Sequence, residues 1–272
     1  MAEAETTTLG QRIGSWFRWI AGASVLIGTI VGIGTVVAIV VGVVLYQNYV
    51  VLNPGPHVER DHIRSIIAQE SPVYYADGST RVGVFFDEEH RQYTSFEELP
   101  PAYVLSIIAA EDDRYWNHWG IDPVGILRAM RLNLSAGGVV AGGSTLTQQT
   151  AKNIYYRPDR SLRAKGIEFL NALRLEHRYS KPEILEFYAN QFYVSGNGRG
   201  LGIGARHFFN KDVSRLTLAE CAFLAGLVKG PANYDPFLGS AARSERNTER
   251  AHNRTRYVLG RLVEEDAARL VR

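Results

Sequence analysis

Hydrophobic and polar positions divide the chain into a long apolar run, a short β-rich segment and a larger helical region. No Asp, Glu, Lys or Arg occurs between Arg18 and Glu59, and residues 20–46 are almost wholly apolar. A membrane-crossing helix needs about 20 such residues, so the run predicts one transmembrane helix at 20–46. A cleaved signal peptide is the alternative, but its apolar region spans only about 7–15 residues. We therefore predict an uncleaved anchor.

The charges that flank this run predict its orientation. Arg12 and Arg18 precede it, whereas acidic Glu59 and Asp61 follow it. Because basic residues next to a membrane helix stay on the cytoplasmic side, we expect residues 1–19 to form a cytoplasmic tail. The rest of the chain is then expected outside the cytoplasm, as a single-pass protein.

A stalk and a small β-hairpin are predicted at 47–95. The sequence Asn53-Pro54-Gly55-Pro56 breaks the apolar helix. Two β-rich runs, 72–76 and 81–86, flank Asp77-Gly78. An Asp-Gly pair between two such runs is typical of a hairpin turn.

From Pro100 onward the pattern becomes helical. Helix starts are indicated at Pro101, after Asp122, near Ser161, and at the capping boxes that begin with Ser180 and Thr217. We count six or seven helices and no alternation of strands with helices. The predicted fold class is therefore mainly α with a small β-hairpin, with a helical domain at 96–240. An Arg-rich helix is expected at 241–272, its arginines forming a solvated face or contacting anionic lipid head groups.

Composition narrows the classes of function. Net charge is +2, from 30 basic and 28 acidic residues, which is too balanced to predict nucleic-acid binding. The single cysteine, Cys221, excludes an internal disulfide and a cysteine-based metal cluster. It lies in an apolar helical run, so we expect it in the core.

Glu111 is the first candidate for chemistry. It ends an apolar helix, preceded by Leu105, Ile107, Ile108, Ala109 and Ala110. A carboxylate in such surroundings loses hydration, which raises its pKa toward that of a usable proton acceptor. The alternative is an exposed glutamate at the end of a helix, in an Asp-rich turn.

A Gly-rich turn and a polar helix follow at 142–153. Gly142-Gly143 allows close backbone approach, Ser144 can cap the helix, and free amides at a helix start bind anions. Lys152 lies one turn after Gln148 and could pair with a phosphate. Read alone, the same pattern is an ordinary capped polar helix.

Glu168 is a second candidate carboxylate, in the helix that begins near Ser161. Its neighbours are apolar, and residue 164 is alanine rather than a base, which argues against a surface i, i+4 ion pair. A carboxylate near the first could orient a nucleophile, hold a cation or stabilise positive charge that develops on a sugar.

Five sequence blocks occur in order between Glu111 and Pro236. They are Glu111-Asp112 with His118-Trp119-Gly120, Gly142 to Asn153, Lys165 to Glu168, Ser180 to Tyr193, and Leu218 to Pro236. Together they resemble the peptidoglycan glycosyltransferase family, which comprises monofunctional glycan polymerases and the N-terminal module of class A penicillin-binding proteins. Each block alone is weakly specific, but five in register are very specific.

The resemblance implies a lysozyme-like helical domain, part of which dips into the outer leaflet of the bacterial inner membrane. The implied substrate is lipid II, a disaccharide-pentapeptide on undecaprenyl diphosphate, which the family polymerises into β-1,4 glycan strands with inversion. By this resemblance Glu111 is the general base for the acceptor's 4-hydroxyl. Glu168 is placed near the leaving diphosphate or a bound divalent cation.

The resemblance also implies the binding residues and partners. Residues implied to bind the donor are Ser144, Thr145, Gln148, Gln149, Lys152, Asn153, Arg160 and Lys165. No cofactor is obligatory, although many members are helped by Mg²⁺ or Mn²⁺. Implied partners are the growing glycan strand, membrane lipid, and proteins of cell-wall synthesis or division. Ala164 departs from the arginine usual in the family, which puts the affinity for the donor phosphates in question.

Two other functions stay open. A lytic transglycosylase or muramidase on the same fold would cleave glycan and needs no lipid-diphosphate site, so Glu168, Lys152 and the anchor argue against it. An inactive scaffold that binds lipid II is the non-enzymatic alternative, against which the intact pair of carboxylates argues. No transpeptidase motif follows, so we expect polymerisation without cross-linking unless the chain is part of a longer enzyme.

Overall fold

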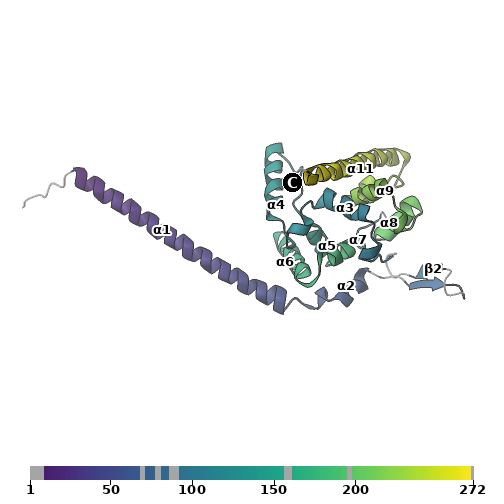
Figure 1. Ribbon diagram of the computed structural model, residues 1–272, viewed down its shortest axis with the longest axis horizontal. Coiled ribbons are helices and arrows are strands. Elements are labelled where there is room, and N and C mark those ends of the chain that lie inside the picture. The colour runs from purple at the N-terminus through teal and green to yellow at the C-terminus, as the bar shows by residue number, and fades with distance from the viewer. Residues whose placement is uncertain are drawn as a thin grey trace, which may run out of the picture. The chain divides into compact units, whose positions relative to one another are not determined.

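The computed structural model describes residues 9–67, 71–76, 81–85, 92–155, 161–194 and 198–270. The chain divides into two compact units, of which the first ends at Asn53 and the second begins at Pro54. Figure 1 labels their helices and strands. Each unit is described separately below.

The first unit is one long helix, α1 (Leu9–Tyr46), followed by a π-helical turn, η1 (Gln47–Leu52). The helix ends where the sequence predicts but begins before residue 20. A span of 29 residues, Ser24–Leu52, is long and apolar enough to cross a membrane. At 1.5 Å per residue such a span is about 43 Å long, more than the roughly 30 Å of a bilayer's hydrocarbon core. The first unit therefore fits a single-pass anchor.

Polar side chains within this helix find partners on the helix itself. The hydroxyls of Thr29 and Thr35 donate hydrogen bonds to the carbonyl oxygens of Val25 and Val31, at 2.9 and 2.8 Å. Both hydroxyls are therefore hydrogen-bonded without water or a second helix. A polar group inside a lipid bilayer must find its hydrogen-bond partner within the protein.

The second unit is built mainly from helices. Its elements in chain order are η2 (Pro56–Val58), α2 (Arg60–Ile67), β1 (Ser71–Tyr74), β2 (Arg81–Phe85), η3 (Phe96–Glu98), α3 (Pro101–Glu111), η4 (Tyr115–Asn117), α4 (Pro123–Ala136), α5 (Leu146–Ile154), α6 (Leu162–Arg178), α7 (Lys181–Ala189), α8 (Leu201–Phe209), η5 (Val213–Arg215), α9 (Leu218–Leu227), α10 (Pro231–Tyr234) and α11 (Ala241–Leu270). The predicted mainly α class is confirmed.

Helix α3 is the centre of this unit. It is apolar nearly all round, a pattern typical of a helix enclosed by others. Tyr103, Ile107 and Ile108 on α3 are buried in one continuous core. Helices α9 and α11 pack against α3, and Figure 1 shows α3 among the other helices of the unit. The position of α3 decides where its last residue, Glu111, points.

The predicted helix starts are confirmed, whereas the predicted number of helices is wrong. Asp122 caps α4 by accepting a hydrogen bond from the amide of Val124 at 3.1 Å. Capping boxes open α7 at Ser180 and α9 at Thr217. Among the described residues nine α-helices follow Pro100, from α3 to α11, rather than six or seven. Elements as short as α10, with 4 residues, are too brief to show a helical period in sequence.

Strands β1 and β2 pair in an antiparallel manner, with Ser71 opposite Phe85 and Val73 opposite Gly83. The expected turn at Asp77-Gly78 lies outside the described residues. The hairpin as a whole therefore stays a prediction.

Candidate active site

A cavity of about 910 Å³ opens at the C-terminal end of α3. Its walls come from α3, the segment that leads into α5, α5 itself, α6, the residues after α9, and α11. Both candidate carboxylates line it. So do six of the eight predicted binding residues: Ser144, Thr145, Gln149, Lys152, Asn153 and Lys165. Segments far apart in the chain thus converge on one space.

Glu111 lies in the wall of this cavity with only 16% of its side chain exposed. Arg254 donates a hydrogen bond from Nη2 to Oε1 at 2.5 Å, and Gln149 donates from Nε2 to Oε2 at 3.4 Å. Burial raises the pKa of Glu111, while the charges of Arg254 and Lys229 and the bond from Gln149 oppose that rise. The alternative of an exposed glutamate in a turn is therefore wrong.

Asp112 connects the turn that follows Glu111 to the start of α5. Its buried carboxylate accepts a hydrogen bond from the amide of Leu146 at 2.8 Å and contacts Nε2 of His118 at 3.0 Å. The amide of Gly120 donates to Nδ1 of the same imidazole at 3.1 Å. In this arrangement Nδ1 accepts from the amide of Gly120 and Nε2 donates to Asp112, so the His118 ring fixes the Asp112 carboxylate. This chain of bonds holds Glu111 and α5 in one geometry.

Thr145, not Ser144, caps α5. Its hydroxyl accepts from the amide of Gln148 at 3.1 Å and donates to the carbonyl of Gly120 at 2.7 Å. Gln148 is fully buried, and its side-chain oxygen accepts from the amide of Thr145 at 2.9 Å. It does not line the cavity. Its predicted role in substrate binding stays a prediction, and the structure places its side chain in the capping box.

Two lysines supply positive charge to the same space. Lys165 donates to Ser144 Oγ at 3.1 Å and forms an ion pair with the buried carboxylate of Glu168. Lys152, on α5, is exposed to the cavity. Ammonium groups of this kind bind phosphate oxygens as point charges. Arg160, the remaining predicted binding residue, lies outside the described residues.

The described residues do not form a preformed binding site for the predicted divalent cation. In the part of the chain that the structure describes, no three His, Cys, Asp or Glu side chains gather as metal ligands do. The carboxylate of Glu168 is instead paired with Lys165. This donor set does not fit a cation held by the protein alone. A metal requirement stays a prediction.

Sequence reasoning missed the contribution of α11. Its arginines were expected to form a solvated face or to contact lipid head groups, yet Arg254 and Arg261 line the cavity. Arg254 pairs with Glu111, and Arg261 contacts Asp113 at 3.2 Å. Partners more than 140 residues apart leave no local pattern, so only the packing of α11 on α3 reveals them.

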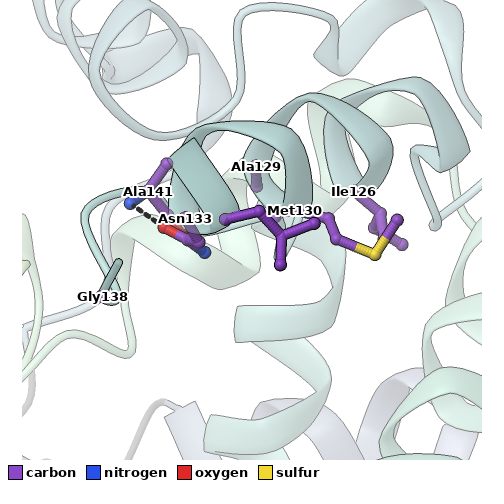
Figure 2. Close-up of a pocket in the computed structure, with 8 residues that line it drawn as sticks. Ile126, Ala129, Met130, Asn133, Gly138 and Ala141 are labelled. Atoms are coloured by element: carbon purple, nitrogen blue, oxygen red, sulfur yellow. Dashed lines mark hydrogen bonds between the residues drawn. The ribbon is translucent and has the colours of Figure 1, made fainter. Parts of the chain in front are cut away.

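A second, smaller cavity of about 410 Å³ lies between α4 and the segment before α5. Figure 2 shows Ile126, Ala129 and Met130 along α4, with Asn133 bonded to the backbone of Ala141. Helix α4 and the segment after it expose large apolar side chains, of which Met130 and Leu134 line this cavity: Leu127, Met130, Leu132, Leu134, Val139 and Val140. Exposed apolar side chains gathered in one segment are typical of contact with a membrane or another molecule.

Comparison with known proteins identifies the family of this chain. Residues 78–263 match the family described as Transglycosylase. The chain belongs to the transglycosylase family. The match includes both carboxylates of the cavity, most of α11 and every residue of the cavity wall except Glu264.

Relatives of this transglycosylase chain carry the name penicillin-binding protein 1A. The protein of Neisseria flavescens is 42% identical over 193 residues, covering 71% of this chain and 23% of the relative. The protein of Aquifex aeolicus is 37% identical over 240 residues, covering 87% of this chain and 31% of the relative. The chain thus spans 23% to 31% of the length of these relatives. The family match and these relatives together confirm the predicted resemblance to the peptidoglycan glycosyltransferase family.

Proposed function

We propose that this transglycosylase chain polymerises lipid II into β-1,4 glycan strands and releases undecaprenyl diphosphate. The observation that carries the proposal is the placement of Glu111, a carboxylate of raised pKa, in the same cavity as Lys152 and the Ser144–Lys165–Glu168 cluster. A proton acceptor and an anion-binding wall in one space are what a displacement at a phosphate-bearing sugar needs.

The reaction has one nucleophile and one leaving group. Glu111 accepts the proton of the acceptor's 4-hydroxyl, and that oxygen forms a bond to the anomeric carbon of the donor. The bond from this carbon to the lipid diphosphate breaks, and the electron pair leaves with the phosphate oxygen. Because attack comes from the opposite face, the configuration inverts from α to β. Lys152 and Lys165 stabilise the charge that builds on the diphosphate.

The rival reading is a hydrolase that uses the same glutamate as a general acid. A general acid must carry a proton at working pH, whereas Arg254 at 2.5 Å favours the ionised form of Glu111. The ion pair counts for a base, whereas burial, which raises the pKa of Glu111, acts the other way, so the products of the reaction separate the two functions. An inactive scaffold is separated from both by experiment.

The location proposed for the reaction is the outer face of the bacterial cytoplasmic membrane. Helix α1 serves as the single-pass anchor with its N-terminus in the cytoplasm, as the flanking charges predict. The exposed apolar side chains of α4 fit contact with the outer leaflet, where the lipid chain of the substrate resides. Partners proposed with it are the growing glycan strand, membrane lipid and proteins of cell-wall synthesis or division.

The test uses the purified full chain in detergent with labelled lipid II, and products are separated by length. Glu111→Gln keeps the shape but removes the proton acceptor, so we expect turnover to fall by about 10²–10⁴-fold with lipid II binding retained. Glu249→Gln, an exposed position on α11, is the matched control and should behave as wild type. Undiminished turnover by Glu111→Gln refutes the assignment of the base. Bound lipid II without product from the wild type indicates a scaffold, and shortening of preformed glycan indicates a hydrolase.

A further inference from the structure

Two arginines on α11 reach the turn that contains the proposed base. Arg254 Nη2 lies 2.5 Å from Oε1 of Glu111, and Arg261 Nη2 lies 3.2 Å from Oδ2 of Asp113. Arg261 Nε also donates to the carbonyl of Ala109, on the last turn of α3, at 3.3 Å. The two arginines are seven residues apart, which places them on one face of α11. Helix α11 therefore holds the catalytic turn at two points.

The side chain of Arg254 is fixed by its surroundings. Only 10% of it is exposed, and its guanidinium carbon lies 4.7 Å from the centre of the Tyr257 ring. Gly226 on α9 leaves the room that this side chain occupies, because a Cβ added there would lie 3.0 Å from Cγ of Arg254. A planar guanidinium confined in this way keeps its donors in a fixed orientation. The contact with Glu111 is thus built into the packing of α9 against α11.

The two oxygens of Glu111 have unequal surroundings. Oε1 accepts the short, charge-assisted bond from Arg254, whereas Oε2 has the long 3.4 Å contact with Gln149. Other charged or titratable groups that influence the carboxylate are Lys229, after α9, and Tyr188, on α7. Asp112 is the adjacent residue of the turn, and its carboxylate is bound to His118 and Leu146. Oε2 is consequently the oxygen that is open to a new hydrogen bond.

We propose that Arg254 is a positioning residue for the transfer reaction: it occupies Oε1 of Glu111 and so directs Oε2 toward the acceptor's hydroxyl. The proposal rests on the proposed role of Glu111 as the base. The same ion pair favours the carboxylate over the protonated acid and limits the rise in the pKa of Glu111 that burial causes. Without Arg254 the base would be both misdirected and protonated over more of the pH range.

The test compares Arg254→Met, Arg254→Lys and the control Arg256→Met across pH. Arg256 is exposed on the same helix and lies outside the cavity wall. For Arg254→Met we expect kcat to fall by about 10–100-fold at neutral pH, part of the contribution of a general base. The acid limb of the pH profile should move to higher pH, and KM for lipid II should stay within about threefold, because uniform binding is untouched. Arg254→Lys should recover part of kcat, and Arg256→Met should match wild type.

A second measurement does not depend on activity. The chain is labelled with ¹³C at the glutamate carboxyls, Glu111→Gln identifies the signal of Glu111, and that signal is titrated by NMR. In Arg254→Met its midpoint should move to higher pH. Gly226→Ala, which displaces Arg254 without removing its charge, should shift the midpoint the same way by less, and it serves if Arg254→Met does not fold.

Each result decides the proposal. An unchanged midpoint in both variants overturns it. A raised KM with unchanged kcat also overturns it, because Arg254 would then bind substrate directly. If the wild type forms no glycan, the proposed function fails, while the NMR titration still tests the coupling of Arg254 to Glu111.

Discussion

Replacing Gly120 by alanine should destabilise the second unit, because this glycine packs where a side chain has no room. Gly120 has φ of +87°, and an added Cβ would lie 2.9 Å from the carbonyl oxygen of Ala172 on α6. A left-handed conformation costs an alanine about 1–2 kcal/mol. Displacing the backbone of a packed helix costs about 1–3 kcal/mol more. The expected loss of unfolding free energy is therefore about 2–5 kcal/mol.

The assay is thermal unfolding in a fixed detergent, followed by circular dichroism. For a unit of this size 1 kcal/mol corresponds to roughly 2–4 °C, so we expect the midpoint to fall by at least about 4 °C. Gly166→Ala is the matched control. Gly166 lies on α6, the helix against which Gly120 packs, and a Cβ added to Gly166 meets nothing within 4 Å. Removing a glycine from a helix interior should stabilise that variant by up to about 1 kcal/mol.

The effect should extend to function, since Gly120 also bonds to His118 and Thr145. A displaced turn would loosen the connection between Glu111 and α5. A midpoint for Gly120→Ala equal to that of wild type would refute the reasoning. It would mean that α6 yields to the methyl group without cost.

Three further predictions concern the cavity and the core. Lys152→Ala should raise the apparent Kd for lipid II about tenfold, because a phosphate partner is lost. Lys211→Ala, which removes a lysine outside the cavity wall, should leave the Kd unchanged. Equal affinity of the two variants in a binding titration would show that Lys152 does not bind the substrate. Turnover should fall as pH decreases through the raised pKa of Glu111, because a base must be ionised, and a rate that holds down to the pKa of an exposed glutamate would contradict this. Burial raises the pKa of Cys221 to about 11, so a thiol reagent at pH 8 should label it only after unfolding, and rapid labelling of the native chain would show that α9 opens.

Local signals in the sequence were enough to locate most secondary structure. Pro101, Asp122, Ser180 and Thr217 each begin a helix because proline geometry and side-chain caps act within four residues. Because these signals act over so few residues, they cannot decide between neighbouring caps. Ser144 and Thr145 are both able to cap, and the choice of Thr145 depends on its bond to the carbonyl of Gly120, which precedes it by 25 residues.

The candidate site was partly predictable for a different reason. Glu111 and Glu168 stand out because their neighbours in sequence are apolar. Burying an acidic side chain costs free energy unless it is paired, so buried acidic residues are often functional. Lys165 was predicted from the family resemblance, but its pairing with Glu168 and Ser144 required the folded chain. Gln148 illustrates the converse, since a polar residue of a conspicuous block proved to be buried in a capping box.

The sequence by itself determined the apolar anchor, the mainly helical class and the two carboxylates, because hydrophobic periodicity, capping and the burial of charge are encoded over short stretches of chain. Only the tertiary structure decided which groups surround Glu111. Arg254 lies 143 residues further along the chain, and it meets Glu111 because α11 packs against α3 beside Gly226. A contact of that kind depends on how helices pack, and helix packing is a property of the whole core rather than of any segment.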